Sequence, residues 1–482
     1  MCIRDRAGGT HRGGVSPAEP GPFDLIILGA GPAGVGLAHR AARDGRSVCI
    51  VERGSAPGGL AASIEVAGVR VDLGSHRLHG TIAPPILATL EALLGPDLQA
   101  HERRGRIRLA GRWLRFPLHG PDLARNLPPA MASGMAWDLA STPVRRRRAG
   151  AADSFSEAVR AAVGPTLAHR FYLPYARKIW GLDPDELSAE QARRRISAGG
   201  PLTLVRRVLA GDGARAHLSP RRGYGQIWEA LLDDARHAGA EVLLGTTVVG
   251  IVGGGPITEV RLAGGGTRRG HIVASTIPLA ALTGLVTPAP APRVRASAAS
   301  LRSRAMVLVY LELDGRPYTP FDAHYLPEGW TPVTRISEPS NYRVSADDPA
   351  DRTILCAEIP CDAGDGLWRA DDAALAGVVT HALGAAGMPP SRLRGVETRR
   401  LASAYPVLAR GFEDALGTVA AWADALPGVV TLGRQGLFTH DNAHHALAMA
   451  WAAADALGPD GGFDDVAWER ALAGFAHHVV ED

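Results

Sequence analysis

The sequence feature that most constrains the fold is a glycine-rich turn between an apolar segment and a predicted helix. Gly29, Gly31 and Gly34 have the spacing G-x-G-x-x-G, and they directly follow the apolar run DLIIL at 24–28. A run of this kind is typical of a buried parallel strand, and glycines let the backbone approach a pyrophosphate closely. The segment therefore predicts a nucleotide-binding βαβ unit in which the helix N-terminus faces the phosphate charge.

A carboxylate at the end of the next predicted strand supports this interpretation. Residues 33–44 are predicted to form a helix that ends at Gly45, and SVCIV at 47–51 is predicted to be a second buried strand, followed by Glu52. Glu52 stands 52 − 29 = 23 residues after the first glycine, close to the roughly 20 residues at which an acidic group meets a ribose hydroxyl. A glutamate here also disfavours the 2′-phosphate of NADP.

Length and composition predict a globular protein of two structural units. The chain has 482 residues, and this length exceeds the usual size of one hydrophobic core. Of these residues 46% are hydrophobic and 21% are charged, which is typical of a globular protein. A net charge of +3 is too small to indicate a nucleic-acid partner, so we expect none. The four cysteines show neither metal-site spacing nor a disulfide framework, which favours a reducing, cytoplasmic location.

Two segments bear on membrane contact. Residues 1–22 are rich in Gly, Pro, Ser and Arg and lack a signal-peptide core, so we expect a disordered tail. No run reaches the roughly 20 apolar residues of a membrane span. Residues 127–148 pair an apolar segment with a basic end, as interfacial helices do, which leaves peripheral membrane contact as an expectation.

The segment RGSAPGGLAASIEVAGVRVDLGSH, residues 53–76, follows the first nucleotide motif. Gly58 and Gly59 form a second turn, and Asp72, Gly74 and His76 follow a predicted short hairpin. In order and spacing this resembles the superfamily of flavin-containing amine oxidases and protoporphyrinogen oxidases, which also includes carotenoid desaturases and UDP-galactopyranose mutase. The resemblance implies FAD as the cofactor.

Later segments resemble the same superfamily, at 217–251, 271–282 and 429–457. The fold implied is α/β, with a Rossmann-like FAD-binding domain of the glutathione-reductase type and a discontinuous α+β substrate domain. We expect 23–85, 215–290 and 395–482 in the FAD-binding domain, and 86–214 and 291–394 in the substrate domain.

The resemblance and the glycine pattern together imply the residues that contact FAD, with Val248 beside the adenine and Arg434 beside the ring or the pyrophosphate. A helix capped by Asp441 or Asn442 would aim its N-terminus at the flavin and favour the anionic reduced form. The expected cofactor contacts are Gly29, Gly31, Pro32, Ala33, Gly34, Glu52, Arg53, Gly58, Gly59, Leu60, Gly74, His76, Val248, Gly433, Arg434, Asn442 and Ala446.

Three histidines near this helix, His440, His444 and His445, could suggest a metal because an i, i+4 pair lies on one helix face. No further acidic or cysteine ligand stands at a recognised metal spacing. We therefore expect no metal, and we expect the histidines to line a flavin or substrate wall.

Candidate catalytic residues are His76, Lys178, Arg195, Arg335 and Tyr405. Lys178 and Arg195 fall in 171–196, which resembles a signature of the mutase and protoporphyrinogen-oxidase-like members, and cations there could bind a carboxylate or diphosphate. The alternative is a core helix that ends at Gly181, with 184–186 opening the next helix. Residues 306–314 alternate like a half-buried strand.

The leading functional hypothesis is an FAD-dependent oxidoreductase that transfers hydride from a substrate C–H or C–N bond to flavin N5. The main alternative is a sugar-nucleotide isomerase resembling UDP-galactopyranose mutase, and a third is an FAD-binding protein without catalysis. A small-molecule substrate suits the first two hypotheses, and the cationic residues allow it to be anionic. The sequence indicates neither the particular substrate nor the oligomeric state.

Overall fold

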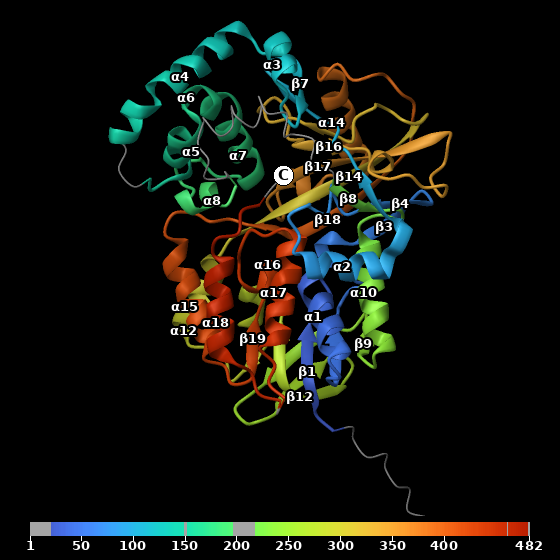
Figure 1. Cartoon of the computed structure of the whole chain (residues 1–482), viewed down its shortest axis with the longest axis vertical. Coiled ribbons are helices and arrows are strands. Elements are labelled where there is room, and N and C mark those ends of the chain that lie inside the picture. The colour runs from blue at the N-terminus through green and yellow to red at the C-terminus, as the bar shows by residue number, and fades with distance from the viewer. Residues whose placement is uncertain (1–20, 149–151, 196–216, 460, 481–482) are drawn as a thin grey trace, which may run out of the picture.

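The structure is a computed structural model that describes residues 21–148, 152–195, 217–459 and 461–480, with the backbone alone for 142–148. The tail predicted at 1–22 lies outside the described residues except for its last two. Figure 1 shows an α/β unit in its lower half, with a sheet and a group of helices above it.

An eight-stranded sheet forms the centre of the lower unit. Its strand order is β13-β10-β11-β12-β1-β2-β9, with β19 pairing β12. The five strands β9, β2, β1, β12 and β19 are parallel. β11 pairs antiparallel with β12, β10 pairs antiparallel with β11, and β13 pairs parallel with β10. The strands are β1 (Phe23–Leu28), β2 (Val48–Val51), β9 (Glu241–Leu243), β10 (Val248–Val252), β11 (Thr258–Leu262), β12 (Thr267–Ser275), β13 (Val286–Thr287) and β19 (Val429–Thr431).

Helices cover both faces of this sheet, which explains why β1 is apolar throughout. Leu25 and Ile27 belong to the core on one face, and Ile26 and Leu28 to the core on the other. The first face carries α1 (Pro32–Arg43), α2 (Pro84–Leu94), α10 (Gly225–His237), α17 (Ala443–Asp455) and α18 (Asp465–Phe475). The second carries α11 (Leu279–Leu282), α12 (Pro292–Ser300) and α15 (Phe412–Asp424).

A second sheet of seven strands has the order β18-β14-β17-β16-β15-β6-β7 and is antiparallel except between β15 and β6. β18 lies here, although residues from 395 onward were predicted to belong to the FAD-binding domain. The strands are β6 (Gly105–Leu109), β7 (Arg112–Phe116), β14 (Ser303–Asp314), β15 (Ala323–Tyr325), β16 (Arg335–Ser337), β17 (Arg352–Cys361) and β18 (Leu393–Pro406).

The strand β14 is buried on both faces, which corrects the prediction of a half-buried strand. Val307 and Val309 pack with α14 (Asp372–Ala385), whereas Leu308 and Tyr310 pack with the hairpin of β3 (Ser63–Val66) and β4 (Val69–Asp72). A layer therefore covers each side of the sheet, so that neither set of alternating side chains reaches solvent.

A group of helices between 120 and 193 forms the third part, at the upper left of Figure 1. Gly181, in the left-handed conformation at φ 67°, ends α7 as predicted. The next helix, α8, begins at Ala189 rather than at 184–186 because the Ser188 hydroxyl caps it by accepting from Glu190 N–H. The helices are α3 (Gly120–Asn126), α4 (Pro129–Arg148), α5 (Phe155–Val163), α6 (Pro165–Leu167), η3 (Ala168–Tyr172), α7 (Leu173–Trp180) and α8 (Ala189–Arg193).

Shorter elements complete the chain: η1 (Gly59–Ala61), η2 (Gly95–Asp97), β5 (Leu98–His101), β8 (His217–Pro220), η4 (Pro339–Asn341), α13 (Gly366–Arg369) and α16 (Gly433–Gly436). Within the described residues, no helix combines the length and the apolar character that crossing a membrane requires. α4 is the helix expected at 127–148, and Trp137 on it is 74% exposed. Its contact with a membrane surface stays a prediction.

The turn between β1 and α1 depends on close packing of two glycines. Gly29 has φ +99°, and a Cβ placed on Gly34 would lie 1.9 Å from the Gly29 carbonyl oxygen. A side chain at position 34 would therefore push the first turn of α1 away from the end of β1.

We predict that Gly34→Ala destabilises the protein by about 1–3 kcal/mol because the added methyl group overpacks this turn. The matched control is Gly377→Ala in α14, where a Cβ meets nothing within 4 Å. That substitution is expected to stabilise by roughly 0.5–1 kcal/mol, since alanine favours a helix interior. Denaturant unfolding of both variants measures the difference, and equal effects would contradict the packing argument.

Candidate functional site

A cavity of about 1350 Å³ lies where the two sheets and the helices meet. Pockets for one small ligand usually occupy about 300–1,000 Å³. The walls come from the β1–α1 turn, the segments after β2 and β4, the helices α5 and α7, β18 and the region around α16 and α17. The space is therefore large enough for a dinucleotide and a substrate together.

The nucleotide end of the cavity is built around Glu52. The backbone N–H of Ala30 donates to Glu52 Oε2 at 2.8 Å, and that of Gly54 donates to Oε1 at 2.7 Å. These bonds fix the carboxylate while each oxygen keeps lone pairs for ribose hydroxyls. No side chain caps α1, and a Cβ on Gly31 would meet nothing within 4 Å, so the helix N-terminus is open to a phosphate.

Most of the predicted cofactor residues line this cavity. Those that do are Gly29, Gly31, Pro32, Ala33, Glu52, Arg53, Gly59, Leu60, His76, Val248, Gly433, Arg434, Asn442 and Ala446. Gly34, Gly58 and Gly74 lie behind the wall. Gly58 N–H donates to Ala30 O at 2.7 Å, and a Cβ on Gly58 would lie 2.8 Å from Trp228. These three glycines permit close backbone packing rather than direct contact with a ligand.

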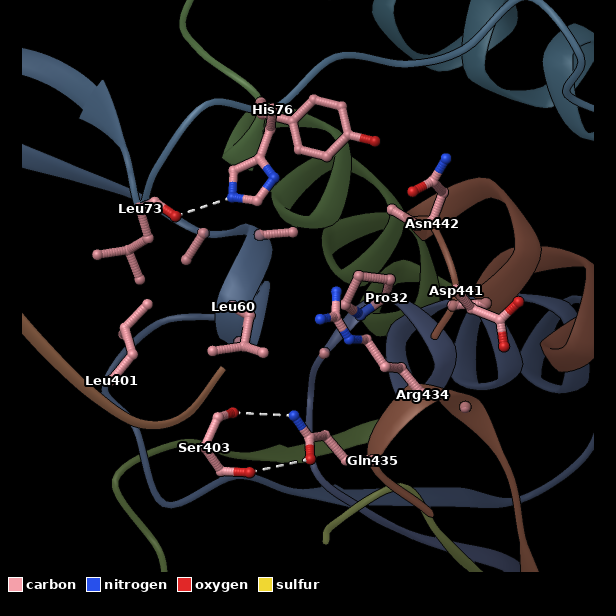
Figure 2. A pocket seen from close by; sticks show the side chains of 18 of the residues that line it. Pro32, Leu60, Leu73, His76, Leu401, Ser403, Arg434, Gln435, Asp441 and Asn442 are labelled. Carbon is pink, nitrogen blue, oxygen red and sulfur yellow. Dashed lines mark hydrogen bonds between the residues drawn. The ribbon is translucent and has the colours of Figure 1, made fainter. Parts of the chain in front are cut away.

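His76 stands at the other end of the predicted flavin site. Figure 2 shows His76, Pro32, Arg434 and Asn442, from three parts of the chain, around one region of the cavity. Burial lowers the pKa of His76, so its ring is neutral. The Leu73 carbonyl, 2.8 Å from Nε2, can only accept a hydrogen bond, so Nε2 carries the proton and Nδ1 is an acceptor.

The segment that carries His76 is held from three directions. The Asp72 carboxylate accepts from the Ser63 hydroxyl at 2.6 Å and from Tyr224 N–H at 2.8 Å. The Tyr310 hydroxyl of β14 donates to the Asp72 carbonyl at 2.8 Å. The Tyr224 ring stacks on His76 with centroids 5.4 Å apart. The imidazole therefore has a fixed position in the cavity wall.

Arg335 lines the cavity, but its guanidinium is occupied by a buried carboxylate. Its Nε and Nη2 each donate to Glu358 at 2.9 Å, and Glu358 also accepts from Ser75 N–H at 3.0 Å. Although burial opposes the charge, Glu358 and nearby tyrosines raise the pKa of Arg335 well above its usual value. The contacts of Arg335 therefore hold the segment before His76, and its predicted catalytic role stays a prediction.

Arg195 and Tyr405 lie together near α7. The Arg195 guanidinium is 5.5 Å from the Trp180 ring and 5.8 Å from the Tyr405 ring, and it lines the cavity. Tyr405 is not among the lining residues; it stands behind the wall, with Arg434 4.9 Å away and His440 stacked on it. Tyr405 can thus orient the two arginines that reach the cavity.

Lys178, the remaining catalytic prediction, does not line the cavity. Its ammonium donates to the backbone carbonyls of Leu326, Glu328 and Val333, at 2.5, 3.0 and 2.7 Å. All three of its donors are therefore used to hold the segment after β15. This corrects the catalytic assignment of Lys178 to a structural one, because no donor is left for a substrate.

The three histidines considered for a metal do not converge. His440 bonds to the Pro406 carbonyl at 2.8 Å and faces Tyr405. His444 Nε2 lies 3.3 Å from the Thr81 hydroxyl, and only His445 faces Asp441.

Sequence reasoning missed Arg77, Arg103 and Glu358. Glu358 is the only charged residue in the apolar run ILCAEIPC at 354–361, and such a residue signals a buried partner. Arg77 and Arg103 both line the cavity, but they occur in polar segments without a distinguishing pattern.

The cavity carries an excess of positive charge and much aromatic surface. Burial and the nearby Arg77 lower the pKa of His217 to about 3, so this lining histidine adds no charge. Two carboxylates, Glu52 and Asp441, face seven arginines: Arg53, Arg77, Arg103, Arg195, Arg335, Arg400 and Arg434. The aromatic lining residues are Phe116, Phe155, Phe171, Tyr172, Tyr175, Trp180, Tyr224 and Tyr325. Such a cavity suits an anion with an apolar body.

We predict that Glu52→Ala weakens binding of the dinucleotide roughly tenfold or more, because it removes a charged acceptor for ribose hydroxyls. Glu65→Ala, at an exposed position of β3, is the matched control. Reconstitution of apoprotein with FAD, followed by flavin fluorescence, measures the dissociation constants. Unfolding of the two apoproteins separates lost affinity from lost stability, and unchanged FAD affinity in Glu52→Ala would refute the assignment.

We predict that Arg335→Met lowers the free energy of unfolding by about 3–5 kcal/mol, since it leaves Glu358 buried without its partner. The double variant Arg335→Met with Glu358→Leu should recover most of that loss. Arg410→Met is the control, because its ion pair with Asp153 is exposed and should change stability by about 1 kcal/mol or less. No recovery in the double variant would show that the pair does not act as a unit.

Comparisons with known proteins agree with this geometry. Among solved structures, reduced UDP-galactopyranose mutase aligns with a TM-score of 0.76 at 19% identity, covering 89% of this chain and 93% of that one. A protein from Exiguobacterium sp. 255-15 named as a protoporphyrinogen oxidase aligns at 0.67 and 17%, covering 93% and 98%. Putrescine oxidase bound to putrescine aligns at 0.65 and 16%, covering 90% and 98%. These likenesses confirm the predicted fold class.

Sequence comparison gives the family. A protein of Mycobacterium tuberculosis that bears the name flavin-containing monoamine oxidase AofH is 28% identical over 240 residues. The match covers 48% of this chain, and the chain spans about half the length, 51%, of this relative. The family model described as flavin containing amine oxidoreductase matches residues 32–450. Because the family model matches most of its length, the chain belongs to the flavin-containing amine oxidoreductase family, a family of enzymes.

Proposed function

We propose that the protein is an FAD-dependent oxidoreductase that oxidises a C–H or C–N bond of an anionic small molecule. The observation that carries the proposal is the cavity lining, in which eight aromatic side chains stand among seven arginines and two carboxylates. Of these arginines, Arg77 and Arg335 form ion pairs with Asp322 and Glu358. The family supplies the flavin, and a cavity of about 1350 Å³ leaves room for its dinucleotide form.

The residues present fit FAD. Glu52 would hold the adenosine ribose, the open N-terminus of α1 would hold the pyrophosphate, and Val248 would lie beside the adenine. Arg434 and Asn442 would hold the flavin end, near His76. When bound, FAD supplies the acceptor for a hydride, and the protein supplies position and electrostatics.

The charge of the cavity distinguishes this protein from an enzyme for cationic amines. Arg103, Arg195 and Arg434 lie over the aromatic rings of Phe116, Trp180 and Tyr405, which place three cationic side chains at the cavity wall. A protonated amine would be repelled here, whereas a carboxylate or phosphate would gain charge-assisted hydrogen bonds. The chain therefore orients an anionic substrate through permanent cations.

His76 contributes as a neutral group in this proposal. Its Nδ1 can accept a hydrogen bond, and its fixed position excludes it from acting as a mobile proton carrier. Removal of a hydride does not demand a strong base, which agrees with the absence of a free carboxylate near His76 among the described lining residues.

A second candidate function is a flavin-dependent sugar-nucleotide isomerase similar to UDP-galactopyranose mutase. The arginine-lined cavity suits a nucleoside diphosphate as well as a carboxylate, and reduced UDP-galactopyranose mutase is the structural neighbour with TM-score 0.76. The isomerase would need no electron acceptor, so the two candidates differ in net redox change.

The test is anaerobic addition of single compounds to the oxidised holoprotein while flavin absorption is recorded. We expect loss of the oxidised flavin spectrum with an anionic compound, such as a porphyrinogen, and its return when air is admitted. A nucleotide sugar that is converted only after dithionite reduction would overturn the oxidoreductase proposal and favour the isomerase. Bleaching by amines alone would overturn the anionic substrate.

Arg195→Met should raise the substrate concentration for half-maximal bleaching roughly tenfold, because one charge-assisted hydrogen bond is lost. Arg193→Met is the matched control, since Arg193 is exposed at the end of α8, two residues before Arg195, and pairs with Glu190. Equal effects of the two substitutions would place the substrate elsewhere.

A further inference from the structure

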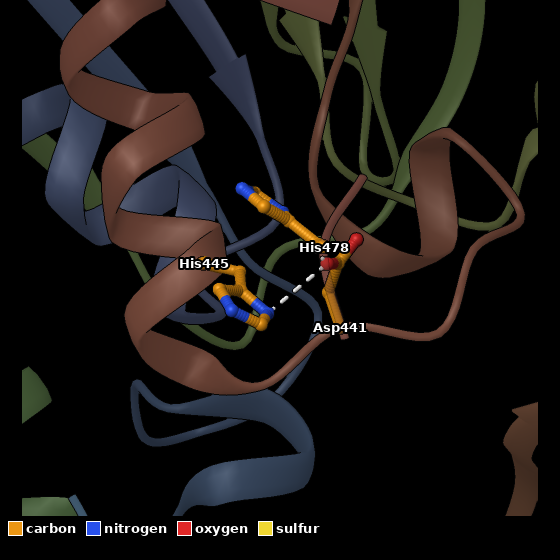
Figure 3. Close-up of side chains that lie close together, drawn as sticks. All are labelled: Asp441, His445 and His478. Carbon is orange, nitrogen blue, oxygen red and sulfur yellow. Dashed lines mark hydrogen bonds and ion pairs between the residues drawn. The ribbon is translucent and has the colours of Figure 1, made fainter. Parts of the chain in front are cut away.

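Asp441, His445 and His478 form a cluster at the edge of the cavity wall. Asp441 precedes α17, His445 lies in its first turn, and His478 follows α18, so the chain returns to complete the group (Figure 3). Asp441 Oδ1 lies 3.2 Å from His445 Nδ1 and 3.0 Å from His478 Nδ1. The imidazole rings of His445 and His478 stack with centroids 4.1 Å apart and an interplanar angle of 16°.

The carboxylate of this cluster is buried and only half satisfied. The Asp441 side chain has 0% exposure. Within the part of the chain that the structure describes, Oδ2 has no hydrogen-bond partner. Burial opposes ionisation, but the two imidazoles more than offset it and hold the pKa of Asp441 below its usual value. A buried charge of this kind needs a compensating cation or further donors.

The environment of His445 Nδ1 is also unbalanced. The backbone N–H of Asn442 donates to this nitrogen at 3.2 Å, which requires its lone pair. The Asp441 oxygen at the same distance instead requires a proton on it. One nitrogen cannot meet both demands in one protonation state. A cation between Asp441 Oδ1 and His445 Nδ1 would accept a lone pair from each atom. The long hydrogen bond from Asn442 N–H to His445 Nδ1 would then be lost.

We propose that Asp441, His445 and His478 bind a divalent first-row transition metal, with Zn²⁺ as the ion to test. Two imidazoles and a carboxylate are ligands that Zn²⁺ accepts at about 2.0–2.2 Å, which places neighbouring ligand atoms roughly 3.0–3.6 Å apart. One ligand atom from each residue lies within 4.8 Å of the others. Binding would release any proton held on the two Nδ1 atoms.

The site would fasten the chain after α18 to the cavity wall. Asp441, Val479 and Val480 line the cavity, and Val480 N–H donates to the Arg194 carbonyl at 2.8 Å. A metal held by His478 and by the start of α17 would thus fix this wall without contacting the substrate. The inference goes beyond the proposed function, and it departs from the expectation of no metal because His478 is far from α17 in sequence.

The experiment is calorimetric titration of Zn²⁺ into the flavin-loaded full chain, freed of metal by a chelator and of any histidine tag. The variants are His478→Ala and Asp441→Asn. The control is His477→Ala, because His477 is the exposed neighbour of the proposed ligand. We expect one Zn²⁺ per chain, affinity at least roughly tenfold lower in both ligand variants, and no change in His477→Ala.

A spectroscopic measurement counts the nitrogen ligands of the bound metal. Electron paramagnetic resonance of bound Cu²⁺ should show coupling to two nitrogens in the parent protein and to one in His478→Ala. If Asp441→Asn fails to fold, His478→Ala still tests the proposal. His478 lies after α18, the last helix, so we expect its substitution to leave the fold intact. The proposal is overturned by the lack of a 1:1 site, by unchanged binding in His478→Ala, or by an equal loss in His477→Ala.

Discussion

The buried pair of Arg335 and Glu358 is the interaction on which the rest of the site depends. Both residues belong to the seven-stranded sheet, yet Glu358 also accepts from Ser75 N–H, in the segment that leaves the other unit. Arg335 reaches the Ser75 carbonyl at 3.4 Å. One charged pair thus binds both sides of Ser75 and fixes the next residue, His76. Its cost of burial is offset because the carboxylate and the guanidinium satisfy each other bidentately.

The nucleotide half of the site could be predicted from sequence because its determinants are local. Gly29, Gly31 and Glu52 occur in one βαβ unit, where the order of strand, turn and helix fixes their relative positions. The position of each residue in the cavity follows from backbone geometry alone.

The substrate half could be predicted only in outline, because its contacts join distant segments. Lys178 stood in the expected cationic signature, but the carbonyls it binds lie about 150 residues away, which no local pattern reveals. Burial of β14 on both faces likewise depends on the hairpin at 63–72. Arg195 and Tyr405 were predicted to be catalytic; Arg195 lines the cavity and Tyr405 stands behind its wall, and the ring contact between them comes from tertiary packing.

Buried histidines and arginines give the cavity region a charge that changes little with pH. Burial lowers the pKa of His217 and of His444 to about 3, against an ordinary value of 6.5. Because the folded-state pKa is the lower one, the unfolded chain binds more protons below pH 6.5, and acid therefore favours unfolding. Above that pH these histidines are neutral in both states, and the arginines alone set the sign of the cavity.

The arginines of the cavity fall into two groups according to what holds them. Arg335 and Arg77 form ion pairs with the carboxylates Glu358 and Asp322, so these carboxylates neutralise their charges. Arg195 and Arg434 are held over the Tyr405 ring, which orients a guanidinium without cancelling its charge. A ring placed behind the wall thus orders two cations of the cavity lining. Because these two arginines and Tyr405 lie together, the end of the cavity near Tyr405 is where we expect an anionic group of the substrate to bind.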